Sequence, residues 1–153
     1  YPTVILEHTE LAELYAAGKY LPFSHETMLE TTKEMYGILF EAGITILRVG
    51  LKSTDLVTAG ADLGGGYHPA FRQLVEGEII KEKMLSILES LSPDTKTVTF
   101  FSNRRWFSAM IGHKACNKKA LTRLYPELNI RFRVDATLSD GQVEGQEMAA
   151  DDD

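Results

Sequence analysis

The stretch AMIGHKACNKKALTRLYPELNIRFRV, residues 109–134, decides the fold of the C-terminal part of this chain. A short apolar segment ends at Gly112, and a second segment, residues 116–127, places Leu121 and Leu124 on one side of a helix. A tight connection through His113 and Lys114 separates the two segments. The pattern therefore predicts helix, tight turn, helix.

The residues on either side of these helices predict strands. NIRFRV, residues 129–134, alternates, which places Ile130, Phe132 and Val134 toward a core and the two arginines outward. TVTFF, residues 97–101, alternates in the same way, and Asn103 after it is a residue type that begins helices. The expected order of this part is β-α-α-β.

Positive charge is concentrated in the same region. Residues 96–133 hold nine Lys or Arg and one acid, Glu127, whereas the rest of the chain holds 7 basic and 21 acidic residues. The region is thus +8 and the remainder −14. A local field of this size attracts polyanions even though the whole chain is acidic.

The composition limits the class of protein. The 153 residues include one cysteine, Cys116, so an internal disulfide is impossible, which fits a reducing, cytoplasmic location. No apolar run approaches the roughly 18 residues of a membrane span. Because the chain opens on YPTVIL without Met, we expect a fragment of a longer protein.

The first two-thirds of the chain alternate between predicted strands and helices. Residues 2–7 and 44–51 predict buried strands, and two helices between them begin after Thr9 and Ser24. We expect a parallel β-α-β unit. In the second helix an apolar stripe is expected to face the core, formed by Met28, Met35, Ile38, Leu39 and Ala42.

The remaining segments complete the predicted organisation. Gly64 to Gly66 predict a flexible loop, and a long helix is expected over residues 69–91. SPDTK, residues 92–96, predicts a domain boundary near Ser92. Residues 136–153 are acidic with little to bury, so we expect a disordered tail.

The β-α-α-β module resembles the minimal KH motif, whose helix–GXXG–helix turn clamps single-stranded nucleic acid. Gly112-His113-Lys114-Ala115 occupies the turn, although Ala115 replaces the last glycine and Lys118 stands where an aliphatic residue is usual. The resemblance implies an RNA-binding surface, with these candidate residues: Gly112, His113, Lys114, Lys118, Lys119, Arg104, Arg105 and Arg131. The alternative is a small α/β module with a solvated basic face.

Three residues outside that list have two interpretations each. His68 fixes a loop by a hydrogen bond or faces a substrate, and the first interpretation is preferred. Arg48 reaches the mouth of a parallel sheet as a substrate-facing group, or pairs with Glu41 or Asp55, which we prefer. Cys116, beside a basic turn, is either a reactive thiol or, as we expect, a buried structural one. No pair of histidines has metal-ligand spacing.

A second resemblance covers roughly residues 1–135. YPT at residues 1–3, TEL at 9–11, GKY at 18–20, RVGL at 48–51 and YHPAF at 67–71 follow one another as in the C-terminal region of radical S-adenosylmethionine (radical SAM) proteins. The similar proteins are bacterial ones related to the catalytic subunit of Elongator and, more distantly, to oxygen-independent coproporphyrinogen oxidases. The order of the motifs carries the resemblance, because no single motif is decisive.

This resemblance implies a fold for each part of the chain and a catalytic role for the parent protein outside it. Residues 1–91 are expected to be the last part of a radical-SAM-type α/β barrel, and residues 92–135 a KH-like basic module. The parent protein is expected to bind an iron–sulfur cluster and S-adenosylmethionine through a CxxxCxxC motif, which a chain with one cysteine cannot supply. The chain itself is then a non-catalytic α/β (α+β) portion with no metal or cofactor of its own.

Partners follow from the same reasoning. We expect RNA, with tRNA as the substrate class, the upstream catalytic barrel of the same protein, and no membrane. Unpaired strand edges in residues 1–91 predict homodimerisation of the isolated chain. The alternatives are a structural domain whose basic face docks an acidic protein, and a barrel-completing part of an oxidoreductase similar to the coproporphyrinogen oxidases.

Overall fold

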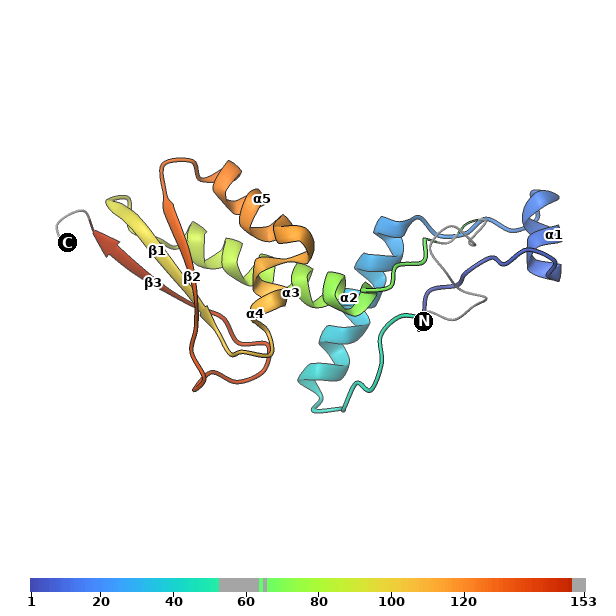
Figure 1. The fold of residues 1–153 in the computed structure, drawn as a ribbon, viewed down its shortest axis with the longest axis horizontal. Helices are drawn as coiled ribbons and strands as arrows, with labels where there is room; N and C mark the ends of the chain where they lie inside the picture. Colours follow the sequence, from blue (N-terminus) through green and yellow to red (C-terminus); the bar gives the residue numbers. More distant parts are fainter. Residues whose placement is uncertain (53–63, 65, 150–153) are drawn as a thin grey trace. The chain divides into compact units, whose positions relative to one another are not determined.

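A computed structural model describes residues 1–52, 64 and 66–149 of the chain (Figure 1). The chain divides into two compact units, Tyr1–Val75 and Glu76–Asp153. The fold mixes helices with one small sheet and is α+β, as the sequence predicts. In the part of the chain that the structure describes, no helix has both the length and the hydropathy to cross a bilayer.

The N-terminal unit contains α1 (Glu10–Ala16) and α2 (His25–Glu41), both at the predicted positions. Their starts are fixed by side-chain caps. Thr9 Oγ1 accepts a hydrogen bond from the Ala12 amide at 3.2 Å, and Ser24 Oγ accepts one from the Thr27 amide at 3.1 Å. Each cap satisfies an amide that has no partner within its own helix.

The two strands predicted in this unit are not formed, so the predicted parallel β-α-β unit is wrong for the described residues. Residues 44–51 contain no strand, and residues 2–7 contain only an isolated bridge at Leu6, beside a hydrogen bond from the Ile5 amide to the Gly64 carbonyl at 3.1 Å. A strand requires a partner with which to build a ladder. Neither segment builds such a ladder among the described residues, although both have strand-like composition. The glycine loop predicted at residues 64–66 includes Gly65, which lies outside them.

The buried face of α2 also differs from the prediction. Met28 and Tyr36 are buried, but Met35 is 58% and Ile38 is 68% exposed. Arg72 approaches the Tyr36 ring, with 6.0 Å from the guanidinium carbon to the centroid. The core of this unit therefore lies on the Met28–Tyr36 side of α2, and most of the predicted stripe is solvent-facing.

The C-terminal unit carries the predicted β-α-α-β order. Its elements are β1 (Thr95–Ser102), α4 (Phe107–Ile111), the short helix η1 (His113–Ala115), α5 (Cys116–Leu124), β2 (Asn129–Val134) and β3 (Glu144–Ala149). The sheet order is β2-β1-β3, with β1 parallel to β2 and antiparallel to β3. Asn103 Oδ1 accepts from the Trp106 amide at 3.0 Å, as expected of a residue that begins a helical turn.

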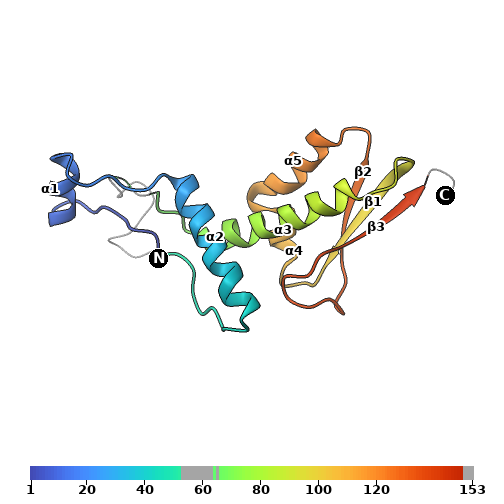
Figure 2. The ribbon, with the colours of Figure 1, turned by 180° about the vertical axis from the view of Figure 1, so that it is seen from behind.

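The helices lie on one side of this sheet (Figures 1 and 2). α3 (Phe71–Glu89) lies where the sequence predicts a long helix, and its buried Ile80, Met84 and Leu88 share the core with Val98 and Phe100 of β1. On β2, Ile130 and Phe132 are half-buried as expected. Val134, expected to face inward, is 46% exposed.

The predicted disordered tail is wrong for residues 144–149, which form β3. This strand pairs with β1 from Phe101↔Glu144 to Thr95↔Ala149 and so satisfies the second edge of β1. Gly145 allows the close approach, because a Cβ there would lie 2.6 Å from Ile87 Cγ2 of α3. Tertiary pairing therefore orders a segment whose composition alone favours disorder.

The expected boundary near Ser92 is a turn within the second unit. The Ser92 amide donates to Glu147 Oε2 at 3.1 Å, and the Thr95 hydroxyl donates to the same oxygen at 2.6 Å. The compact units instead divide after Val75, inside α3. The apolar face of α3 packs in the same core as the sheet, which is why most of this helix belongs to the second unit.

Candidate nucleic-acid interface

The turn between α4 and α5 has an unusual backbone. Gly112 has φ +83° and ψ 158°, and two residues without a glycine's freedom, Lys114 and Ala115, have φ of 51° and 60°. The left-handed region costs a non-glycine residue about 1–2 kcal/mol. Ala115 thus adopts the conformation that the fourth glycine of a GXXG turn would adopt without strain.

Gly112 is required for steric as well as conformational reasons. A Cβ at this position would lie 2.7 Å from both the Asn117 amide nitrogen and Cys116 Sγ. The glycine therefore allows the end of α4 to approach the first turn of α5. The sequence predicts the tight turn, and the structure adds this steric reason.

Asn117 anchors the turn to two helices. Its side chain is 1% exposed, and its amide nitrogen donates to the carbonyls of Gly77 in α3 at 2.8 Å and Ala109 in α4 at 3.1 Å. Sequence reasoning missed this role. The available signal was spacing, since Asn117 lies four residues before the buried Leu121 and therefore shares its inward face.

The opposite face of α5 is cationic. Lys118, Lys119 and Arg123 are exposed on this helix, and Lys114 is exposed just before it. Among residues 1–52, 64 and 66–149, none of these four cations forms an ion pair. The N-terminal end of the helix dipole points to the same turn and adds a partial positive charge.

His113 and Cys116 belong to the same turn but differ from each other in exposure. His113 is half-buried within η1, whereas Cys116 is exposed, so the expectation of a buried structural thiol is wrong. Cys116 Sγ lies 3.6 Å from Asn117 Oδ1. Cys116 is therefore an exposed residue at the start of α5, with its sulfur beside Asn117.

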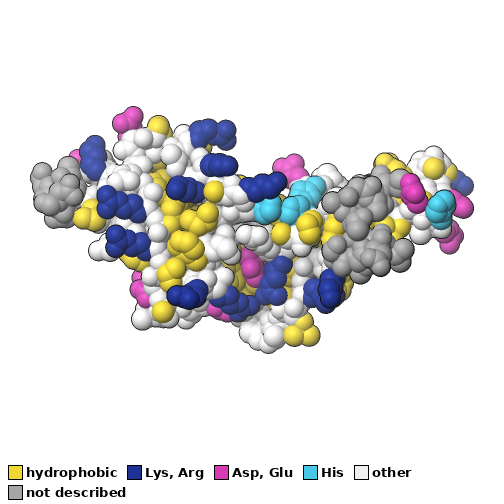
Figure 3. All heavy atoms as spheres, in the orientation of Figure 1, with side chains coloured by type: hydrophobic (Ala, Val, Ile, Leu, Met, Phe, Trp, Pro, Cys, Tyr) yellow, Lys and Arg dark blue, Asp and Glu magenta, His cyan; other side chains and the backbone are white. Residues whose placement is uncertain are grey.

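The cations of β2 lie on the sheet. Arg131 and Arg133 are exposed and alternate with the half-buried Ile130 and Phe132, whose ring lies 6.1 Å from that of Phe100. Figure 3 shows hydrophobic side chains of the C-terminal unit exposed as a strip, with Lys and Arg side chains on both sides of it. An apolar strip between cations is suited to a ligand with an anionic backbone and apolar rings.

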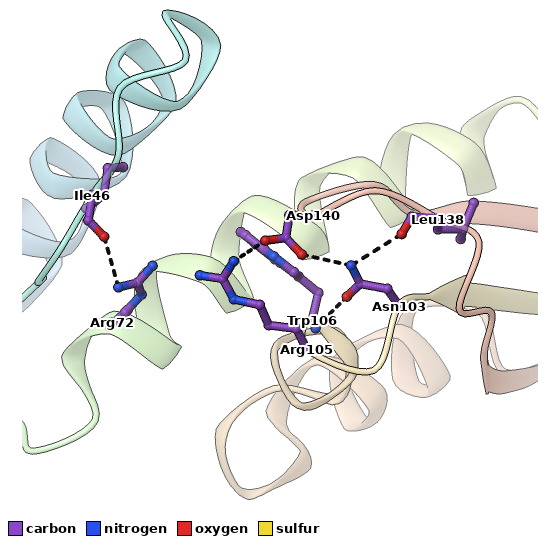
Figure 4. A network of polar contacts seen from close by, with 7 residues as sticks. All are labelled: Ile46, Arg72, Asn103, Arg105, Trp106, Leu138 and Asp140. Atoms are coloured by element: carbon purple, nitrogen blue, oxygen red, sulfur yellow. Dashed lines mark hydrogen bonds and ion pairs between the residues drawn. The ribbon is translucent and has the colours of Figure 1, made fainter.

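Arg104 and Arg105 follow β1, and the structure separates their roles. Arg104 is exposed, whereas Arg105 forms an ion pair with Asp140 (Figure 4). Asp140 also accepts from Asn103 Nδ2 at 2.8 Å, and the same amide nitrogen contacts the Leu138 carbonyl at 3.3 Å. Arg105 thus holds the segment before β3 in place, and its charge is already balanced.

The two candidate residues of the N-terminal unit do not form a site with each other. His68 Nδ1 accepts a hydrogen bond from the Ala70 amide at 3.1 Å, which is the loop-fixing role preferred from the sequence, and its ring lies 6.3 Å from that of His25. Arg48 is exposed on a segment without strand structure, so it lies at no sheet mouth. Among the described residues Arg48 has no ion pair, with Glu41 or otherwise, and Asp55 lies outside them.

The fold and this surface define an α+β protein with a helix–turn–helix basic module. Comparison with family models matches residues 1–81 to the Radical_SAM C-terminal domain. This match covers more than half of the chain, and the chain therefore belongs to the Radical_SAM C-terminal domain family. No curated protein and no solved structure matches the chain.

The family implies an iron–sulfur cluster and S-adenosylmethionine for the parent protein. A cluster is held by several Cys thiolates, and the chain contains one Cys. Within the described ranges, no three His, Cys, Asp or Glu side chains gather where a metal would bind. The residues of this chain do not fit the cluster, and we derive no chemical step through it.

Proposed function

We propose that this chain is the non-catalytic C-terminal part of a radical SAM enzyme and that its C-terminal unit binds single-stranded RNA. The α4–α5 turn carries the proposal. This turn contains a required glycine and two left-handed residues, and it lies at the N-terminus of α5. Four exposed cations lie on or beside it, and among the described residues none of them has an ion-pair partner. By analogy with relatives of the Elongator catalytic subunit, tRNA is the substrate class.

The physical basis is complementarity to a phosphate backbone. Gly112 allows the tight turn, the first amides of α5 point toward the turn, and Lys114, Lys118 and Lys119 supply charge. The apolar strip of the C-terminal unit gives unstacked bases a surface (Figure 3), and Arg131 and Arg133 of β2 are exposed and add positive charge. Arg104 is a further phosphate contact, whereas Arg105 is not, because Asp140 already neutralises it.

The N-terminal unit has a different proposed role. Its exposed apolar side chains include Leu21 at 81%, Phe23 at 71% and Leu47 at 88% exposure. Where exposed apolar side chains adjoin one another, they mark protein interfaces. We assign this one to the catalytic domain of the same enzyme, which would hold the iron–sulfur cluster and S-adenosylmethionine in the cytoplasm. This domain would also supply a neighbour for residues 44–51, which form no strand in the part of the chain that the structure describes.

The test is a fluorescence-anisotropy titration of the chain with bulk tRNA over a salt series. We expect micromolar affinity with a steep salt dependence, because counterions are released from each neutralised phosphate. The double variant His113→Asp, Lys114→Asp should abolish binding and leave the circular dichroism spectrum native. The double variant Lys19→Asp, Lys52→Gln lowers net charge by the same three units in the other unit, with His counted as neutral, and should bind like the wild type.

The contrary results are equally defined. Flat titrations at low salt would exclude the RNA-binding proposal, and the basic face would then be tested against acidic proteins. Equal losses in both double variants would show that net charge alone governs the affinity, and the turn would lose its assigned role.

A further inference from the structure

A hollow of about 380 Å³ lies in the C-terminal unit, where the residues after α3 approach the end of α5. Leu88, Leu91 and Leu124 give it apolar walls, and Tyr125 contributes an aromatic ring. Leu124 is 60% exposed, so the hollow is open to solvent. None of the residues considered for RNA binding from the sequence lines it.

The cationic face of α5 leads to this hollow. Lys118 and Lys119 lie in the first turn of the helix and Arg123 in the last. The helix rises about 12 Å between Cys116 and Leu124, a span that a short oligonucleotide bridges. Lys96, which lines the hollow, extends the row of cations beyond the helix, and Glu127 is the one acid in its lining. A strand held at the turn therefore has an electrostatic path to the hollow.

We propose that the hollow binds one unstacked nucleobase of the RNA strand whose phosphates contact the α4–α5 turn and α5. The inference rests on the proposed RNA-binding function and adds the place where a base is held. A planar base stacks on the Tyr125 ring between leucine side chains, and Lys96 contacts the adjoining phosphate. Stacking on aromatic side chains and cations along the backbone are the two contributions on which single-strand binding depends.

The charge around the hollow favours a base over an apolar peptide. An apolar peptide would use the leucines but would leave Lys96 and the α5 cations unused. An RNA strand uses both, because its bases are apolar on their faces and its backbone is anionic. The surrounding cations, with no ion-pair partner in the described ranges, therefore select the nucleic acid.

The experiment compares two labelled probes by anisotropy with the full chain: a short oligoriboadenylate and an abasic oligomer of the same length. The wild type should bind the first more tightly. Tyr125→Ala should weaken oligoriboadenylate binding by about 5- to 150-fold, the factor that corresponds to stacking on one aromatic ring, and should leave abasic binding unchanged. Tyr125→Phe keeps the ring and should bind like the wild type.

A second variant protects the test against misfolding at Tyr125. Ser92 is exposed and lines the hollow, so Ser92→Trp fills the space without disturbing the core, and it should reduce the preference for bases in the same way. If RNA binds but base-containing and abasic probes bind equally, the base site is wrong and the phosphate contacts at the turn stand. If no probe binds at low salt, both the proposed base site and the proposed RNA-binding function are wrong.

Discussion

Ala115 shows how one residue can retain a conformation that its side chain opposes. Its φ of 60° is one that glycine adopts freely and alanine adopts with strain. It also precedes α5 without a capping side chain, so it supplies none of the hydrogen bonds that Ser or Asn would. The turn keeps its shape because Gly112 and Asn117 on either side determine it.

The substitution Ala115→Gly should therefore stabilise the C-terminal unit. The free energy gained by relieving the left-handed strain should exceed the cost of the larger conformational entropy of glycine in the unfolded chain. The free energy of unfolding should therefore rise by about 0.5–1 kcal/mol. Urea denaturation measures it. As a matched control, Ala120→Gly inside α5 should lower the free energy of unfolding by about 1 kcal/mol. Equal destabilisation by both would show that Ala115 is unstrained.

β3 is a strand because of its tertiary contacts and not because of its composition. Its sequence, EGQEMA, has little apolar content and low strand propensity, and its order comes from the unpaired edge of β1 and from contacts with the residues after α3. Glu147 makes those contacts. The hydrogen bond from the Thr95 hydroxyl, with that from the Ser92 amide, lowers the pKa of Glu147 below its usual value.

A lowered carboxyl pKa makes the contribution of Glu147 to stability depend on pH. The folded state favours the charged carboxylate, so the stabilisation is present above the unfolded pKa near 4.5 and is lost as pH falls through the lower folded pKa. We expect Glu147→Gln to lower the thermal midpoint at pH 7 and to match the wild type at strongly acidic pH. Thermal scans over a pH series measure the difference in thermal midpoint between the two proteins. A difference that persists unchanged at strongly acidic pH would contradict this role of Glu147.

Asp135 is a necessary control for that pH series. Its pKa is also lowered, by hydrogen bonds from the Thr137 hydroxyl and amide. Asp135 therefore also stabilises the fold at neutral pH, and this stabilisation is also lost as the pH falls. The variant Asp135→Asn removes this contribution and leaves the hydrogen bonds of Glu147 to Thr95 and Ser92 in place. The Glu147 effect should remain in that background.

The whole molecule consists of two units with different surfaces. The C-terminal unit buries its apolar side chains between helices and sheet, whereas the N-terminal unit exposes many of its own, Ile44 at 53% and Ile38 at 68% among them. Exposed apolar side chains of this number can serve an interface where they adjoin one another. This property supports the packing proposed above for the N-terminal unit.

In isolation the chain should therefore self-associate. We expect sedimentation velocity to show dimers or larger species at micromolar concentration, and we expect Ile38→Glu with Leu47→Glu to shift the chain to monomer, because charges on the apolar surface oppose its burial. The control pair Leu124→Glu with Val134→Glu changes exposed apolar side chains of the other unit and should leave association unchanged. A monomeric wild type would contradict the interface.

The sequence by itself determined the helices, the β-α-α-β order and the family. These features depend on local patterns, such as the caps at Thr9 and Ser24 or the alternation in residues 129–134, and on motif order over residues 1–81. Only the tertiary structure decided the rest. Strand-like residues 2–7 and 44–51 build no strand ladder among the described residues, acidic residues 144–149 become a strand, and Arg105 is neutralised by Asp140, because pairing and ion-pair formation depend on partners distant in the chain.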